Sequence, residues 1–261
     1  MTRVYDTFMY GGEADILECR LRELGNSPVD RFVIVEAELT HRGDPKPLYF
    51  REDEARFRPW SDRITYIPVE ADLLPSRAQN PDPWSREHAQ REFAMLGLAD
   101  AEPGDVILHG DCDEIPSRGA VLRLLTTTET LPLVLQMRLA QYAADWVHPL
   151  PWNGTIATRR RSIGSFARLR AQRNSLPVLT DAGTHLSWMG GTDAHVQKLG
   201  LHCHLEMTAA TEEALRSGRW LREGLHSDGH KLIPADVGST WPQWVYHREC
   251  PSTWFRPREE G

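Results

Sequence analysis

"VILHGDCDEIPSRG", residues 106–119, places a cluster of acids directly after a short apolar run. The run predicts a strand over residues 105–110, and Pro116 suits the first turn of the helix that follows. Asp111, Asp113 and Glu114 lie between the two. Acids so close together repel one another unless a positive group lies among them. The stretch therefore predicts a strand that ends in a charged site.

The residues before this stretch alternate between strand and helix patterns. Strands are predicted over residues 3–9, 31–37, 63–69 and 105–110, and helices over residues 11–24, 52–57, 84–99 and 117–125. In the helix that begins at Trp84, the side chains of Ala89, Phe93 and Leu96 are predicted to face the core. Such alternation indicates a parallel sheet covered by helices. The predicted fold class is α/β, a Rossmann-like domain with a mostly parallel central sheet flanked by helices.

The second half of the chain is less regular. "LPLVLQMRLAQYAADW", residues 131–146, predicts a further strand or hairpin, and the residues from 145 to 261 are rich in tryptophan. No clear linker, repeat or low-complexity segment divides the sequence. We therefore predict a single domain over residues 1–261, with a first half at 1–125 and a second half at 126–261.

Composition limits the possible functions and locations. Of the 261 residues, 40% are hydrophobic, which is enough for a sizeable core. Acidic residues outnumber basic ones by 37 to 30, for a formal charge of −7, which argues against a nucleic-acid partner. The four cysteines are scattered, and the sequence has neither a signal region nor about 20 consecutive apolar residues. We expect a cytoplasmic protein without a membrane span.

The position and spacing of the acids favour a bound cation. The crevice of an open parallel sheet lies beyond the carboxyl ends of its strands, where Glu36 and the cluster at 111–114 are predicted. In an extended segment, Asp111 and Asp113 would point the same way, roughly 6–7 Å apart. Their oxygens suit Mg²⁺ or Mn²⁺, which also bind substrate phosphates. The pair predicts a divalent cation that holds a diphosphate; a solvated turn or a helix cap is the alternative.

Other motifs fit this stretch less well. An EF-hand loop that began at Asp111 would need glycine and glutamate where Pro116 and Leu122 stand. Walker A and GxGxxG phosphate-binding loops are absent from the sequence. The acids therefore fit a cation that carries a diphosphate better than they fit these motifs.

Five segments carry a more specific signal than the acids alone. They are "DTFMYGGEADILECRLREL" (6–24), "FVIVEAELTHRGDPKPLYF" (32–50), "WSREHAQREFAMLGL" (84–98), "DVILHGDCDEIP" (105–116) and "HLSWMGGTDAHVQKLGLHCHLE" (185–206). In this order they resemble glycosyltransferase family 17, a family of N-acetylglucosaminyltransferases. The resemblance implies a GT-A type fold with a nucleotide-sugar-binding first half and an acceptor-side second half. It also implies a UDP-sugar donor and inversion at the anomeric carbon.

The resemblance implies roles for individual residues. Asp111 and Asp113 would hold Mn²⁺ or Mg²⁺ on the donor diphosphate, with His204 as a third ligand. The nucleotide sugar would be bound by Thr7, Glu36, Lys46, Arg91, Asp111 and Lys198. A cation at this place would stabilise the charge that builds on the departing UDP.

Some of these residues also have simpler explanations. Glu36 could be an acid of a strand-end turn, and Arg91 could form an exposed helix pair with Glu87. His202 and His204 on their own would suggest zinc, but further ligands at a familiar spacing are missing.

Inversion requires a general base that deprotonates the acceptor hydroxyl. Glu206 and Asp193 are the candidates, with Glu206 preferred, while Glu114 suits a supporting role beside the acid pair. Gly190 and Gly191 would let the backbone approach a sugar. Trp146, Trp152 and Trp188 could stack against the sugar rings of the acceptor, and packing in the core is the alternative.

The expected partners are a UDP-sugar donor and an acceptor that is a glycan, a lipid-linked sugar or a small molecule. Two other functions fit the acid cluster. One is a metal-dependent nucleotidyl or phosphoryl transferase, and the other is a sugar-nucleotide-binding protein without catalytic activity.

Overall fold

The first half of the chain forms the parallel part of a mixed sheet. In the computed structural model, which describes residues 2–126, 131–201 and 209–256, this part comprises β1 (Val4–Met9), β2 (Arg31–Ala37), β3 (Ile64–Val69) and β4 (Val106–Asp111). The strands lie in the order β3-β2-β1-β4, and each neighbouring pair is parallel. This is the order of the first four strands of a Rossmann fold, so the predicted α/β class is confirmed.

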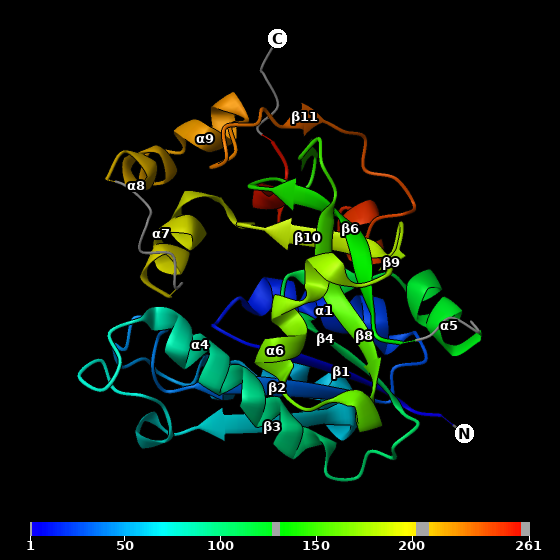
Figure 1. Cartoon of the computed structure of the whole chain (residues 1–261). Coiled ribbons are helices and arrows are strands. Elements are labelled where there is room, and N and C mark those ends of the chain that lie inside the picture. Colours follow the sequence, from blue (N-terminus) through cyan, green and yellow to red (C-terminus); the bar gives the residue numbers. More distant parts are fainter. Residues whose placement is uncertain (1, 127–130, 202–208, 257–261) are drawn as a thin grey trace.

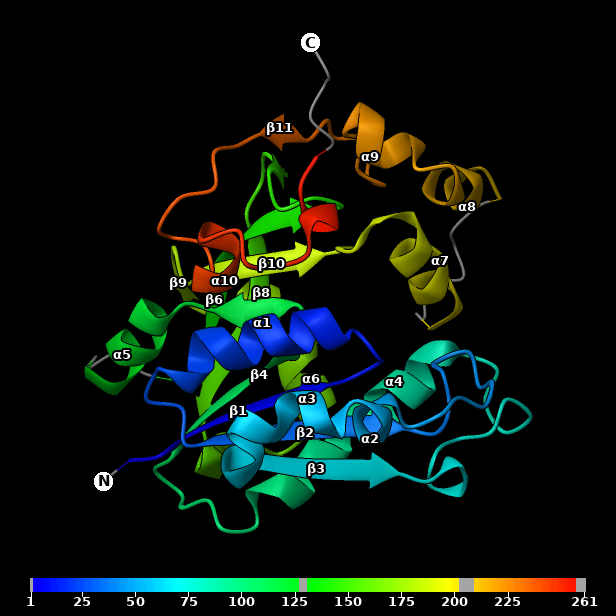
Figure 2. The same ribbon diagram turned by 180° about the vertical axis from the view of Figure 1, so that it is seen from behind.

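Helices cover both faces of the parallel strands. Figure 2 shows α1 (Ala14–Gly25), α2 (Tyr49–Glu52) and α3 (Glu54–Phe57) on one face, and Figure 1 shows α4 (Pro83–Glu92) on the other. In β2, Phe32 and Ile34 pack into the core on the α1 side, whereas Val33 and Val35 pack into the core on the α4 side. A strand buried on both faces is apolar throughout, which explains the continuous apolar run in this segment.

The second half of the chain extends the sheet mainly by antiparallel pairing. Its strands, together with one short strand after the acids, are β5 (Glu114–Pro116), β6 (Leu133–Gln141), β7 (Trp146–Val147), β8 (Trp152–Arg159), β9 (Val178–Leu179), β10 (Gly183–Ser187) and β11 (Ile233–Pro234). β8 pairs antiparallel with β4, and β6 continues beyond β8. β10 is parallel to β6 and antiparallel to β5. The sheet therefore joins strands from both predicted halves. That residues 1–261 form a single domain stays a prediction.

The remaining helices flank this extension. They are α5 (Arg118–Thr126), α6 (Phe166–Ala171), α7 (Gly191–Leu201), α8 (Ala209–Arg216), α9 (Arg219–Glu223) and α10 (Gln243–Tyr246). Short 3₁₀ helices are η1 (Arg58–Arg63), η2 (Ala71–Leu73), η3 (Phe93–Leu98), η4 (Arg160–Ser162), η5 (Arg173–Ser175) and η6 (Ser252–Trp254). Within the three described ranges, no helix combines the length and the apolar character that crossing a bilayer requires.

Two local expectations are wrong. Leu96 does not face the core but is 62% exposed, because the helix tightens into η3 after Glu92 and the three-residue turn buries Ala94 and Gly97 instead. Pro116 ends β5 rather than opening a helix, and α5 begins two residues later. Gly97 has no Cβ, and a Cβ at this position would lie only 2.3 Å from Cγ1 of Val33. The glycine therefore lets η3 pack directly against β2.

Candidate active site

A cleft of about 630 Å³ opens where the carboxyl ends of β1 and β4 meet the second half of the chain. Met9 and Asp111, the last residues of these two strands, are paired in register and both line the cleft. From the second half, Trp152, Trp188 and Lys198 complete the wall around the acids. The cleft therefore lies at the edge where ligands of open parallel sheets bind.

The residues 111–114, called the acid turn below, form a tight turn between β4 and β5. The extended geometry expected for Asp111 and Asp113 is therefore wrong, although both side chains line the cleft. The turn closes when the backbone N–H of Asp111 donates to Oε2 of Glu114 (3.1 Å). Because β5 must pair with β10 immediately afterwards, the chain has to reverse at these residues.

Asp111 lies between two buried arginines. Its Oδ1 accepts from Nη2 of Arg91 (2.9 Å) and its Oδ2 from Nη2 of Arg170 (2.7 Å). Burial alone would raise the pKa of Asp111, but Arg170 and Arg91 outweigh it and hold that pKa well below its usual value. The carboxylate is therefore ionised at pH 7, and 38% of its side chain remains exposed to the cleft.

Asp113 is paired with a different set of groups. Nζ of Lys198 donates to its Oδ2 (2.9 Å), and Nε2 of His185 lies 3.3 Å from its Oδ1. Burial alone would raise the pKa of Asp113, but Lys198 and His185 lower it below its usual value. Both carboxylates of the pair are therefore ionised, and each is balanced by positive groups of the protein.

Arg20 of α1 holds the acid turn from behind. Its Nη1 donates to the carbonyl oxygens of Asp111 (2.9 Å), Cys112 (3.1 Å) and Glu114 (2.7 Å). Its Nε and Nη2 donate to the two carboxylate oxygens of Asp6 in β1, at 2.7 and 2.6 Å. Both side chains are fully buried, so this pair fixes the backbone of the turn without contact with solvent.

Glu114 is committed to structural contacts. Besides the N–H of Asp111, its carboxylate accepts from Nε1 of Trp152 (2.7 Å) and from Nη1 of Arg170 (2.8 Å). The residue is fully buried and does not line the cleft. Gly110 lies against it, since a Cβ there would be 2.8 Å from Oε2 of Glu114.

The inner face of α4 is charged rather than apolar. Arg91 is buried and pairs with Glu87, so the predicted partner is present, but the pair is not exposed. Nη1 of Arg91 also lies 3.2 Å from Nε2 of His109. Burial and the nearby Arg91 hold the pKa of His109 well below its usual value, so a neutral ring accepts from the arginine. This face of α4 orients Arg91 toward Asp111.

Thr7 and Glu36 are fully buried and do not line the cleft. Oγ1 of Thr7 donates to the carbonyl of Leu108 (2.9 Å) and lies 2.8 Å from Nδ1 of His109, which orients that ring toward Arg91. Glu36 accepts from Nζ of Lys46 (3.0 Å). Their predicted contacts with a nucleotide sugar stay predictions.

Glu36 also fixes the start of α2. Its carboxylate accepts from the backbone N–H groups of Tyr49 (2.8 Å) and Phe50 (3.0 Å) and from the hydroxyl of Tyr66 (3.0 Å). Lys46, which lines the cleft, is therefore anchored to a carboxylate that is itself fully hydrogen-bonded.

The segment after β10 brings Lys198 to the acid turn. Gly190 (φ 100°) and Gly191 (φ 79°) have positive φ values that favour glycine, and they turn the chain from β10 into α7. Asp193 in the first turn of α7 is exposed and is not part of the cleft wall. The predicted base Glu206 and the predicted ligand His204 lie outside the described residues.

The three tryptophans named from the sequence differ in position. Trp152 and Trp188 line the cleft. Trp146 is 9% exposed and packs into a core cluster, where its Nε1 donates to the carbonyl of Leu221 (2.9 Å).

Sequence reasoning missed two residues of this site. Arg170 in α6 binds both Asp111 and Glu114, but nothing in its arginine-rich segment distinguishes it from its neighbours. His185 of β10 lies beside Asp113 and Trp152. In the sequence it is distinguished only as the first residue of the family segment 185–206. A third group, His148, Asp228 and His230, has ligand atoms within 4.8 Å of one another and could hold a metal ion.

Solved structures resemble this fold only distantly. Glucosyl-3-phosphoglycerate synthase from Mycobacterium tuberculosis, solved with Mn²⁺, UDP and phosphoglyceric acid, is 15% identical with a TM-score of 0.34, covering 94% of this chain and 91% of that one. The inositol-1-phosphate CTP transferase from T. maritima is 10% identical with a TM-score of 0.39, covering 84% of this chain and 96% of that one.

Sequence comparison is more specific. The human and rat β-1,4-mannosyl-glycoprotein 4-β-N-acetylglucosaminyltransferases are each 33% identical to this chain over 154 residues, or 56% of this chain. The matched region spans only 28% of the length of those relatives. The profile of glycosyltransferase family 17 matches residues 1–212, which is most of the chain. The chain therefore belongs to glycosyltransferase family 17.

Proposed function

We propose that this protein is an inverting, metal-dependent glycosyltransferase that transfers a sugar from a UDP-sugar to a hydroxyl acceptor. The sugar we propose is N-acetylglucosamine. The observation that carries the proposal is the acid turn, which presents two ionised carboxylates to a cleft at the carboxyl ends of parallel strands. The human relative is an N-acetylglucosaminyltransferase by name, which supports the choice of sugar. A glycan, a lipid-linked sugar or a small molecule could serve as acceptor, and the cytoplasmic location stays a prediction.

The donor set of the acid turn fits a hard divalent cation. Asp111 and Asp113 offer carboxylate oxygens, which suit Mn²⁺ or Mg²⁺, and His204 is the proposed third ligand. When bound, such an ion supplies positive charge next to the leaving diphosphate. Without it, the carboxylates are balanced by Arg91, Arg170 and Lys198.

Lys198 is the residue we assign to the donor diphosphate. Its ammonium lines the cleft 2.9 Å from Asp113, and Asp113 raises its pKa although burial alone would lower it. The side chain therefore stays positive at pH 7 and can bind a phosphate oxygen once a cation occupies the carboxylate. Lys46 supplies a second positive charge on the same wall. Arg91 acts through Asp111, which it holds in place.

We assign the general base to Glu206. Glu114 is fully buried and hydrogen-bonded, which removes it from contact with an acceptor. Asp193 is exposed and lies outside the cleft wall. A Glu206→Gln variant should keep donor binding and lose at least about 100-fold in kcat, since general-base catalysis contributes 10²–10⁴-fold. A kcat within threefold of the unaltered protein would remove Glu206 from this role.

Calorimetry with UDP-N-acetylglucosamine and Mn²⁺ tests the proposal. The Asp111→Asn/Asp113→Asn double variant should bind the donor at least about 100-fold more weakly, because it lacks the carboxylates that would hold the cation against the diphosphate. A control double variant, Asp62→Asn/Asp72→Asn, changes the net charge equally at two exposed acids and should bind normally. With an acceptor present, release of UDP with an inverted anomeric product is expected, whereas release of N-acetylglucosamine 1-phosphate from this donor would indicate transfer of its uridylyl group instead. Metal-dependent binding that survives in the Asp111/Asp113 variant would contradict the assignment.

A further inference from the structure

Three histidines and one aspartate gather beside the cleft, away from the acid turn. His148 directly follows β7, and His226, Asp228 and His230 lie in the loop that precedes β11. β7 and β11 are antiparallel, with Val147 opposite Ile233, and this pairing brings His148 to the loop. We call residues 226–230 the histidine loop. His226 and Asp228 line the same cleft as the acid turn.

The histidine loop has the geometry of a tight hairpin tip. Leu225 and Lys231 form an antiparallel bridge, and the N–H of His226 donates to the carbonyl of His230 (2.9 Å). Gly229 has a positive φ of 91°, which permits the reversal. The loop thereby places the side chains of Asp228 and His230 close together, on the side where His148 arrives.

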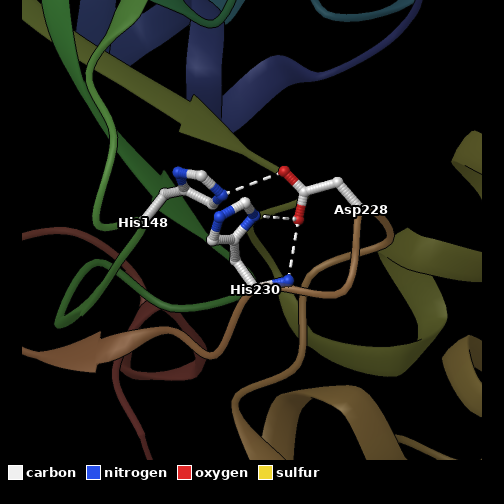
Figure 3. A group of neighbouring side chains, drawn as sticks. All are labelled: His148, Asp228 and His230. Carbon is white, nitrogen blue, oxygen red and sulfur yellow. Dashed lines mark hydrogen bonds and ion pairs between the residues drawn. The ribbon is translucent and has the colours of Figure 1, made fainter.

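The potential ligand atoms converge on one point. Oδ2 of Asp228 lies 3.1 Å from Nε2 of His148, and Oδ1 lies 3.1 Å from Nδ1 of His230. Figure 3 shows the two imidazole rings next to each other, each joined to the Asp228 carboxylate. All three ligand atoms lie within 4.8 Å of one another, a separation that one first-row metal ion can bridge.

The backbone of Leu150 holds the ring of His148 in place. The side chain is 5% exposed, and its Nδ1 lies 3.1 Å from both the carbonyl oxygen and the backbone nitrogen of Leu150, so it can donate to the first or accept from the second. Metal-ligating histidines usually donate their second ring N–H to a backbone carbonyl or a carboxylate, which fixes the ring and the tautomer. A proton on Nδ1 would leave Nε2 as a free ligand that points at Asp228.

We propose that His148 Nε2, the Asp228 carboxylate and His230 Nδ1 bind a divalent transition-metal ion of the zinc class. Two imidazoles and one carboxylate suit Zn²⁺, Co²⁺ or Ni²⁺, whereas the two carboxylates of the acid turn, with a single proposed histidine, suit Mg²⁺ or Mn²⁺. Three protein ligands leave one coordination position open, and Asp228 places the ion at the cleft wall. The site does not depend on the proposed transferase activity.

Titration with Co²⁺, followed by its visible absorption, tests the proposal. The experiment uses the Asp111→Asn/Asp113→Asn protein, so that the acid turn cannot contribute a site and the outcome is independent of the donor-binding test. One Co²⁺ per chain is expected, with the strong absorption of a four-coordinate ion, and excess Zn²⁺ should displace it. Zn²⁺ at about 100 times its Kd should raise Tm by about 5–10 °C.

Ligand variants decide whether these residues form the site. His230→Ala removes a side chain that is 47% exposed, and Asp228→Asn preserves shape, so both proteins should fold. Each should bind Co²⁺ at least about tenfold more weakly, since even outer-shell changes at metal sites cost 10–100-fold. His247→Ala, at an exposed histidine after α10, should leave binding unchanged. Absence of Co²⁺ binding, or binding by both ligand variants equal to that of the parent protein, would overturn the proposal.

Discussion

The acid turn and the histidine loop face the same cleft but are stabilised in different ways. The carboxylates of the acid turn are paired with Arg91, Arg170 and Lys198, which are permanently charged, and Arg20 binds its backbone from behind. The histidine loop is held by its own hairpin hydrogen bonds, and its one carboxylate is surrounded by imidazoles. The acid turn is therefore held by charged side chains from other elements, whereas the histidine loop is held mainly by its own backbone.

The largest effect is expected at Arg20. Arg20→Met would leave Asp6 buried without a partner and three carbonyls of the acid turn without a donor, so the free energy of unfolding should fall by about 3–5 kcal/mol. Arg22→Met is the control on the same helix, because its side chain is 45% exposed and pairs with Glu18. It should cost less than about 1 kcal/mol. Urea unfolding measures both, and similar losses for the two variants would show that Arg20 does not hold the turn.

A smaller effect is expected where the acid turn is most crowded. Gly110→Ala would put a Cβ 2.4 Å from Oγ1 of Thr155 and 2.8 Å from Oε2 of Glu114, and we expect a loss of about 1–3 kcal/mol. Thr155→Ala should relieve part of this clash, so the double variant should show a coupling energy of at least about 0.5 kcal/mol in urea unfolding. If the losses in the free energy of unfolding for the two substitutions are strictly additive, the clash does not involve Thr155.

The smallest effect is expected in the histidine loop. Gly229 has a positive φ, but a Cβ added there would meet no atom of the described residues within 4 Å beyond its chain neighbours, so Gly229→Ala adds backbone strain without a clash. The free energy of unfolding without metal should fall by about 1 kcal/mol, and Gly229→Asn, which tolerates this conformation better, should lose less. Urea unfolding measures both losses. A loss larger than that of Gly110→Ala would mean that the histidine loop is the more constrained of the two.

The regular part of the fold could be predicted because its signals are local. β2 begins and ends at the predicted residues, 31 and 37, and its continuous apolar run follows directly from burial on both faces. The four parallel strands follow from the alternation of strand and helix patterns, and their carboxyl ends place the acid turn at the cleft.

Arg91 and Lys198 were expected at the site, but the other partners could not be predicted, because they arrive from distant parts of the chain. Arg170 meets Asp111 only after β8 has turned back along β4, and His148 meets Asp228 across 80 residues. The buried face of α4 could not be predicted from an amphipathic pattern either, because Arg91 is buried against Asp111 and His109 rather than against apolar side chains. Residues 226–230 carried no prediction from the sequence, because the histidine that completes the proposed metal site, His148, lies in a different part of the chain.

The most direct test of the central claim is a crystal structure of the protein with UDP and Mn²⁺, recorded for anomalous scattering from manganese. We expect a manganese peak bound by the carboxylates of Asp111 and Asp113 and by the diphosphate of UDP. A diphosphate in the cleft whose manganese peak lies away from both carboxylates, or that has no manganese peak, would contradict the account.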